Sequence, residues 1–123
     1  MGPSAEVWVK GMARLLKSPS EIEEAYVNAI RDPNTFSAMC EDYQAGASID
    51  LEHDASDAGM LIGCPTLILW GSKSWTTSAL FDVPAAWQNE AVNIEFKAIE
   101  CGHFLPEENP DETLSALNAF FKT

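Results

Sequence analysis

A histidine stands where an alternating apolar segment gives way to a loop. His103 follows Cys101 and Gly102, directly after residues 93–99, in which Ile94, Phe96 and Ala98 alternate with their neighbours. An unperturbed imidazole has a pKa of about 6.5, so a histidine in such a place suits a general base. A surface histidine or a hydrogen-bonded loop histidine would show the same pattern. The position alone leaves both interpretations open.

Cys101 beside His103 raises the possibilities of metal binding and thiol chemistry. Two ligands separated by one residue make only half of a zinc site, and His53 and Cys64 show no supporting spacing. A cysteine–histidine nucleophilic pair would need contact between the two side chains. We therefore expect neither a metal nor another cofactor, and no reactive thiol.

Other polar residues have simpler explanations. Tyr43 lies on an apolar helix face, which is typical of a core tyrosine whose hydroxyl reaches a polar partner. The stretch Glu52-His53-Asp54 is interpreted as a solvated turn. Glu107 and Glu108 precede a helix start, where the helix dipole favours carboxylates. None of these residues requires a catalytic role from its position alone.

The second half of the chain predicts a βαβα unit of a parallel sheet. The apolar run Cys64–Gly71 is typical of a strand buried on both faces, and residues 93–99 form a second strand. A helix is expected between them, over Phe81–Glu90. The last helix has Asn109 as its cap, Pro110 as its first residue and Glu112 in a capping box. Its expected buried face comprises Leu114, Leu117, Phe120 and Phe121.

The first third of the chain is expected to be helical. Helices are predicted over Glu6–Leu16, over Glu21–Ile30 with Ser20 as the cap, and from Asp32-Pro33 through Tyr43. The domain boundary is expected near residue 60, between a helical segment (1–60) and the strand-containing segment (61–123). Loops after the carboxyl ends of parallel strands commonly hold active-site residues, and His103 lies in such a loop.

Composition restricts the partners. The chain has 123 residues and a net charge of −12, with seven scattered lysines and arginines. Binding of nucleic acid or of an anionic membrane is therefore not expected. Three widely spaced cysteines and the absence of a leader sequence favour a reduced, cytoplasmic location. The sequence contains no Gly-x-Ser-x-Gly elbow and no glycine-rich phosphate-binding motif.

Four short stretches, in order, resemble the haloacetate (fluoroacetate) dehalogenase branch of the α/β hydrolases. They are Cys40-Glu-Asp-Tyr-Gln-Ala-Gly-Ala47, Asp50-Leu-Glu-His-Asp54, Cys64-Pro-Thr-Leu-Ile-Leu-Trp-Gly-Ser-Lys73 and Gly102-His-Phe-Leu-Pro-Glu-Glu108. The resemblance extends from about Tyr26 onward. It implies a partial α/β-hydrolase fold: a helical cap segment over residues 1–60, then the carboxyl-terminal part of the core over residues 61–123.

The resemblance also implies a chemistry. In that family an aspartate attacks the carbon that bears the halogen, and a histidine activates water to hydrolyse the resulting ester. His103 matches this histidine, and Tyr43 matches a cap tyrosine that helps to hold the departing halide. The nucleophile, its oxyanion donors and the acid partner of the histidine have no match here, so we expect the chain to be inactive alone, with a haloacid as substrate when complemented.

Two alternatives stay open. The chain could supply half of an epoxide or ester hydrolase, since fold does not fix function. It could instead be a binding or assembly module, a homodimer through an exposed sheet edge.

Overall fold

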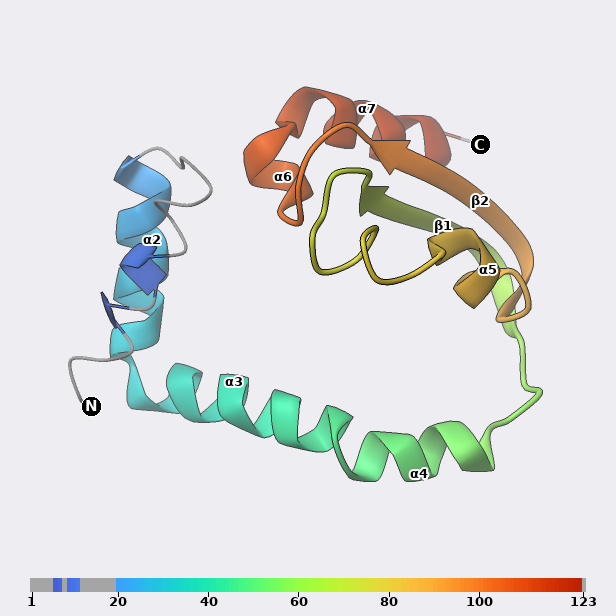
Figure 1. The fold of residues 1–123 in the computed structure, drawn as a ribbon, viewed down its shortest axis with the longest axis horizontal. Coiled ribbons are helices and arrows are strands. Elements are labelled where there is room, and N and C mark those ends of the chain that lie inside the picture. The colour runs from blue at the N-terminus through green and yellow to red at the C-terminus, as the bar shows by residue number, and fades with distance from the viewer. Residues whose placement is uncertain (1–5, 8, 12–19, 123) are drawn as a thin grey trace. The chain divides into compact units, whose positions relative to one another are not determined.

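The computed structural model describes residues 6–7, 9–11 and 20–122. The chain divides into two compact units, Met1–Ala58 and Gly59–Thr123, and each is described by itself. Figure 1 shows helices in the first unit and two strands with accompanying helices in the second. None of the described helices is both long and apolar enough to cross a membrane.

The first unit contains helices α2 (Ser20–Arg31), α3 (Pro33–Gly46) and α4 (Ile49–Ser56). Val27 and Ile30 of α2 are buried with Val9, and Phe36 packs against them. Asp32 caps α3, because its carboxylate accepts the N–H of Asn34 at 2.9 Å and Pro33 follows as the first helical residue. The predicted helices at 21–30 and 33–43 are therefore confirmed. Of the helix expected over Glu6–Leu16, residues 12–16 lie outside the described part.

The stretch Glu52-His53-Asp54 is helical, so its interpretation as a turn is wrong. It lies within α4, although all three residues are exposed as expected. No glycine or proline interrupts residues 49–56, and carboxylates in the first turn favour a helix start. A polar stretch on an exposed helix looks like a turn when hydrophobicity is the only guide.

The second unit contains the predicted βαβα order. Strand β1 (Ile62–Gly71) pairs in parallel with β2 (Ala91–Ile99), in a register that places Gly71 opposite Ile99. Helix α5 (Val83–Trp87) connects them and is capped by Asp82, whose carboxylate accepts the N–H of Ala85 at 3.1 Å. A short helix α6 (Leu105–Glu108) and the last helix α7 (Pro110–Phe120) follow β2. Figure 1 shows α5 and α7 on opposite sides of the sheet.

The core of this unit is small and lies between β2 and α7. Ile99, Cys101 and Ala116 are buried together, and Leu69 and Leu105 pack against them. Residues Thr66–Trp70 of β1 are only half-buried, so the expectation that this strand is buried on both faces is wrong. Within the described residues the sheet has only two strands, so each strand keeps one edge without a strand partner.

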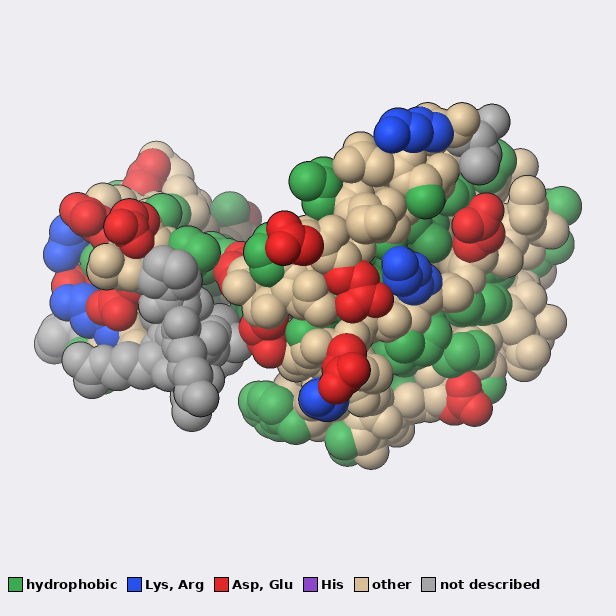
Figure 2. Space-filling model, turned by 90° about the horizontal axis from the view of Figure 1, so that it is seen from above, with side chains coloured by type: hydrophobic (Ala, Val, Ile, Leu, Met, Phe, Trp, Pro, Cys, Tyr) green, Lys and Arg blue, Asp and Glu red, His purple; other side chains and the backbone are tan. Residues whose placement is uncertain are grey.

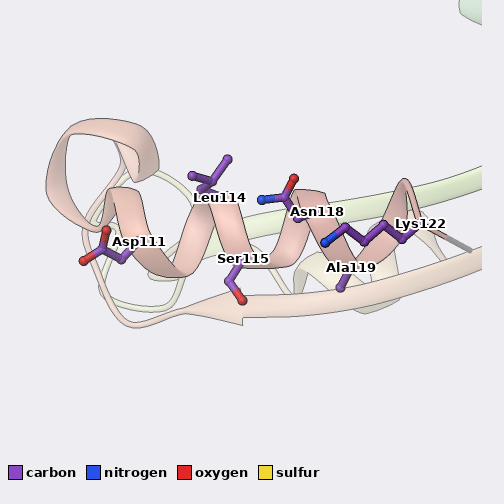
Figure 3. A pocket seen from close by; sticks show the side chains of 6 residues that line it. All are labelled: Asp111, Leu114, Ser115, Asn118, Ala119 and Lys122. Atoms are coloured by element: carbon purple, nitrogen blue, oxygen red, sulfur yellow. The ribbon is translucent and has the colours of Figure 1, made fainter.

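Helix α7 turns a different face to the core from the one predicted. Thr113 and Ala116 are buried, whereas Leu114 is 59% and Phe121 78% exposed. The small side chain of Ala116 and the hydroxyl of Thr113, which donates to the carbonyls of Leu105 and Asn109, let this face lie close to its neighbours. The outward face lines a hollow of about 510 Å³, and all of its lining residues come from α7 or its end (Figure 3).

Gly71 is a position at which a side chain cannot be accommodated. A Cβ there would overlap the carbonyl oxygen of Gly102 and lie 2.8 Å from that of Cys101. We expect Gly71→Ala to lower the free energy of unfolding by about 1–3 kcal/mol, because the two loops must move apart. Gly63→Ala is the control, since nothing lies within 4 Å of a Cβ at that position. Urea unfolding followed by tryptophan fluorescence measures both, and equal stability of the two variants would contradict the close approach.

Candidate active site

The loops that follow the two strands lie side by side. Because β1 and β2 are parallel, their carboxyl ends meet at the same edge of the sheet. Beyond the strand ends, the N–H of Ser72 donates to the carbonyl of Ile99 at 2.8 Å, and the N–H of Lys73 donates to the carbonyl of Cys101 at 2.9 Å. These bonds continue the pairing of the sheet into both loops and so fix the loop that carries His103.

His103 faces a group of hydroxyls from the loop after β1. Its Nδ1 lies 3.1 Å from Thr76 Oγ1, 3.4 Å from Thr77 Oγ1 and 3.5 Å from Ser74 Oγ. We call these three residues the hydroxyl cluster. The ring is otherwise exposed and contacts the edge of Phe104, with the ring centroids 5.0 Å apart. The hydrogen bonds that the structure gives this ring all involve Nδ1, so Nε2 faces away from the cluster.

The hydroxyl cluster is held by its own loop. Ser74 is 1% exposed, and its Oγ accepts the N–H of Thr77 at 3.1 Å and lies 3.2 Å from Thr76 Oγ1. A further bond joins the hydroxyl of Ser78 to the carbonyl of Gly71. The sequence analysis did not single out these three hydroxyl residues. The high serine and threonine content of this loop could have indicated them, because five of the seven residues 72–78 carry a hydroxyl.

Glu108 contacts the backbone on both sides of His103. Its carboxylate oxygens accept the N–H of Gly102 at 2.7 Å and the N–H of Phe104 at 3.0 Å. The expectation that helix-dipole placement alone explains Glu108 is therefore wrong, since this side chain reaches back from the end of α6 to the loop that carries His103. The contact between Glu108 and Gly102 joins residues six positions apart across a loop, and sequence spacing does not predict such a contact.

The predicted cap of α7 is confirmed. Asn109 Oδ1 accepts the N–H of Glu112 at 3.4 Å, and Asn109 Nδ2 donates to the Glu112 carboxylate at 3.0 Å. Pro110 is the first residue of the helix. Glu112 thus bonds the side chain of Asn109 and not its backbone N–H, which donates to the carbonyl of Leu105 at 2.9 Å, so the predicted capping box is wrong in its second half.

Cys101 does not behave as a nucleophile in this structure. It is buried beside Ile99, and this burial raises the pKa of its thiol, with further contributions from the negative charges of Glu108 and Glu112. A thiol with a raised pKa is mostly protonated near neutral pH and is a poor nucleophile. Among the residues that the structure covers, no group of three or more His, Cys, Asp and Glu side chains is placed to hold a metal ion.

Tyr43 is not a core tyrosine. It lies on α3 in the first unit and is 80% exposed, because α3 buries none of its residues. The sequence had suggested an apolar helix face at this position, but the buried face of the first unit is formed by Val9, Val27 and Ile30. The phenol is thus exposed on its own unit.

The chain is similar to two characterised hydrolases. It is 36% identical over 102 residues to fluoroacetate dehalogenase of Burkholderia sp. (83% of this chain and 33% of that protein). It is 34% identical over 105 residues to soluble epoxide hydrolase of Corynebacterium sp. strain C12 (85% of this chain and 34% of that protein). The chain therefore spans about a third of the length of these curated relatives. No family model matches it.

Solved structures extend the similarity to the fold. A candidate α/β hydrolase of Nostoc sp. PCC 7120 superposes with a TM-score of 0.82 at 34% identity, over 95% of this chain and 42% of that one. A candidate epoxide hydrolase of Pseudomonas aeruginosa superposes with a TM-score of 0.81 at 31% identity, over 98% of this chain and 43% of that one. The chain thus has a partial α/β-hydrolase fold, and its sequence is similar to part of a dehalogenase and part of an epoxide hydrolase.

Proposed function

We propose that this chain supplies the water-activating histidine of a dehalogenase-like hydrolase whose nucleophile lies outside it. The observation that carries the proposal is the placement of His103, at the carboxyl edge of the sheet with Nδ1 against the hydroxyl cluster. If Nδ1–H donates to one of these hydroxyls, the lone pair of Nε2 is free to take a proton from water. The similarity to fluoroacetate dehalogenase supports a carbon–halogen bond as the target.

The proposed reaction has two steps. A carboxylate displaces the halide from the carbon of a haloacid, which gives an ester and free halide. His103 then takes a proton from water as the water oxygen attacks the ester carbonyl, and this releases the hydroxy acid and restores the carboxylate. The exposed hydroxyl of Tyr43 is proposed to donate a hydrogen bond to the departing halide.

Among the described residues, the hydrogen bonds that the structure gives His103 involve hydroxyls and no carboxylate. Asp82 caps α5 and Asp111 lies in the first turn of α7, and neither is hydrogen-bonded to His103. Glu108 is engaged with backbone N–H groups. We therefore propose that the nucleophile comes from elsewhere and that the chain alone is inactive.

Epoxide hydrolysis is the second candidate, favoured by the similarity to soluble epoxide hydrolase. In epoxide hydrolysis by the same two steps, the carboxylate would open the ring and form an ester, and the water-activating histidine would hydrolyse that ester to the diol; no halide-binding group is needed. Product assays therefore decide between the two candidates: a dehalogenase releases halide from a haloacid, and an epoxide hydrolase forms a diol from an epoxide.

A chimera tests the role of His103. The segment of the Burkholderia fluoroacetate dehalogenase that aligns with this chain would be replaced by this chain, so that the nucleophile is supplied by the relative. We expect His103→Ala in this chimera to reduce steady-state fluoride release about 10²–10⁴-fold, because general base catalysis of ester hydrolysis is lost. Fluoride release should show a burst of about one equivalent before this slow steady state, with the ester detected as an added mass on the protein.

The other histidine of the chain provides the matched control. His53→Ala removes an exposed histidine of α4 and should leave turnover unchanged. The unmodified chain alone should release no halide from fluoroacetate or chloroacetate. Turnover by the His103→Ala chimera at the rate of the parent chimera would contradict the proposed role.

We also propose that the isolated chain forms a homodimer through its sheet. In the described residues each strand has one edge without a strand partner, and hydrophobic side chains reach the surface of the molecule (Figure 2). The exposed apolar residues near the first strand and on the second include Leu61, Ile62 and Val92. Unpaired edges with exposed apolar side chains favour association.

Sedimentation velocity over a concentration series tests the dimer. We expect a dimer that Val92→Lys shifts to monomer, because a lysine on an outer strand opposes edge pairing. Val7→Lys is the matched control, since Val7 is 68% and Val92 70% exposed but Val7 belongs to the other unit. A monomer at every concentration would contradict the proposal.

A further inference from the structure

The carboxylate of Glu108 brackets the residue proposed as the base. One oxygen accepts the N–H before His103, that of Gly102, at 2.7 Å, and the other accepts the N–H after it, that of Phe104, at 3.0 Å. Hydrogen bonds from N–H groups to an ionised carboxylate are shorter and stronger than neutral ones. The peptide group that follows His103 and the one that precedes Gly102 are thus both held by one side chain.

The surrounding backbone is built for this contact. A Cβ on Gly102 would lie 2.6 Å from both carboxylate oxygens of Glu108, so only glycine leaves room for the bracket. The N–H of Glu108 donates back to the carbonyl of Phe104 at 2.9 Å, which closes a reciprocal pair between these two residues. This pair resembles a capping box, in which a carboxylate near the first turn binds the N–H of the capping residue.

Glu108 is itself anchored to the rest of the unit. The hydroxyl of Thr113, a buried residue of α7, donates to the carbonyl of Leu105 at 3.1 Å and to that of Asn109 at 2.7 Å. These two carbonyls lie on either side of Glu108 in the sequence, at the start of α6 and just beyond its end. On the opposite side of the loop, the N–H of Lys73 holds the carbonyl of Cys101. The loop that carries His103 is therefore fixed from both sides, by the loop that follows β1 and by Glu108.

We propose that Glu108 is a positioning residue that fixes the backbone on both sides of His103 and thereby keeps Nδ1 against the hydroxyl cluster. This inference rests on the proposed function in that it assigns His103 the catalytic role. Glu108 itself touches neither water nor substrate in this mechanism. Its contribution is that the imidazole does not have to be ordered anew in each turnover.

Amide NMR of the full chain tests the bracket without any substitution. As the pH falls through the range in which carboxyl groups gain a proton, the amide protons of Gly102 and Phe104 should move upfield together, with one common midpoint. The same two resonances should not titrate in Glu108→Gln, whose amide keeps one acceptor oxygen and loses the charge. Their hydrogen exchange should become faster by about tenfold or more when the charge-assisted bonds are lost.

The NMR resonances of the His103 ring test whether Glu108 positions this side chain. Its carbon-bound proton resonances should shift in Glu108→Gln and stay in place in Asp111→Asn, a control that removes a nearby exposed carboxylate of α7. If the amide protons of Gly102 and Phe104 do not titrate together in the wild-type chain, the two hydrogen bonds to Glu108 are contradicted. If the ring resonances of His103 are unchanged in Glu108→Gln, the positioning role of Glu108 is contradicted. Normal turnover of the His103→Ala chimera would remove the proposed function while leaving the amide result intact.

Discussion

The parallel pairing of β1 with β2 is the constraint on which the rest of the second unit depends. It brings the ends of both strands to one edge, where Gly71 lies against the carbonyl of Gly102 with no room for a side chain. Because the backbone bonds from Ser72 and Lys73 continue the pairing past the strands, two loops separated by about thirty residues become one surface. The proposed chemistry at His103 is possible only where these loops meet.

The groups around His103 have two roles: some orient its imidazole ring, and Glu108 restrains the backbone of its loop. The hydroxyl cluster contacts Nδ1 of the ring, and Glu108 binds the backbone N–H groups of the two neighbouring residues, Gly102 and Phe104. A carboxylate beside Nδ1 would stabilise an imidazolium more strongly than neutral hydroxyls do. In this chain the only charged group that the structure places against the loop backbone is Glu108, among the described residues.

The local signals in the sequence predicted much of the fold. Asp32-Pro33 and Asn109-Pro110 start helices because a capping side chain and a proline act within a few residues, and the strand ending at Gly71 was visible as an apolar run. Tertiary features were not visible. The buried face of α7 is set by the fit of Thr113 and Ala116, and the contacts of Glu108 and of the hydroxyl cluster join residues whose proximity depends on the completed loops. His103 was predicted because its type and its place after a strand coincide, and its role stays a prediction, whereas the burial of Tyr43 was misjudged from an apolar helix face.

The similarity to dehalogenases and epoxide hydrolases covers about a third of each curated relative, so the proposed reaction depends on groups that this chain does not offer in its described part. What the chain itself has to provide is a histidine with a free lone pair on Nε2. The ¹⁵N chemical shifts of the His103 ring in the folded chain, recorded at a pH at which the ring is neutral, measure this most directly. The contact with the hydroxyl cluster predicts the Nδ1–H tautomer, with Nε2 unprotonated. A ring protonated at Nε2 would contradict the assignment of His103 as the base.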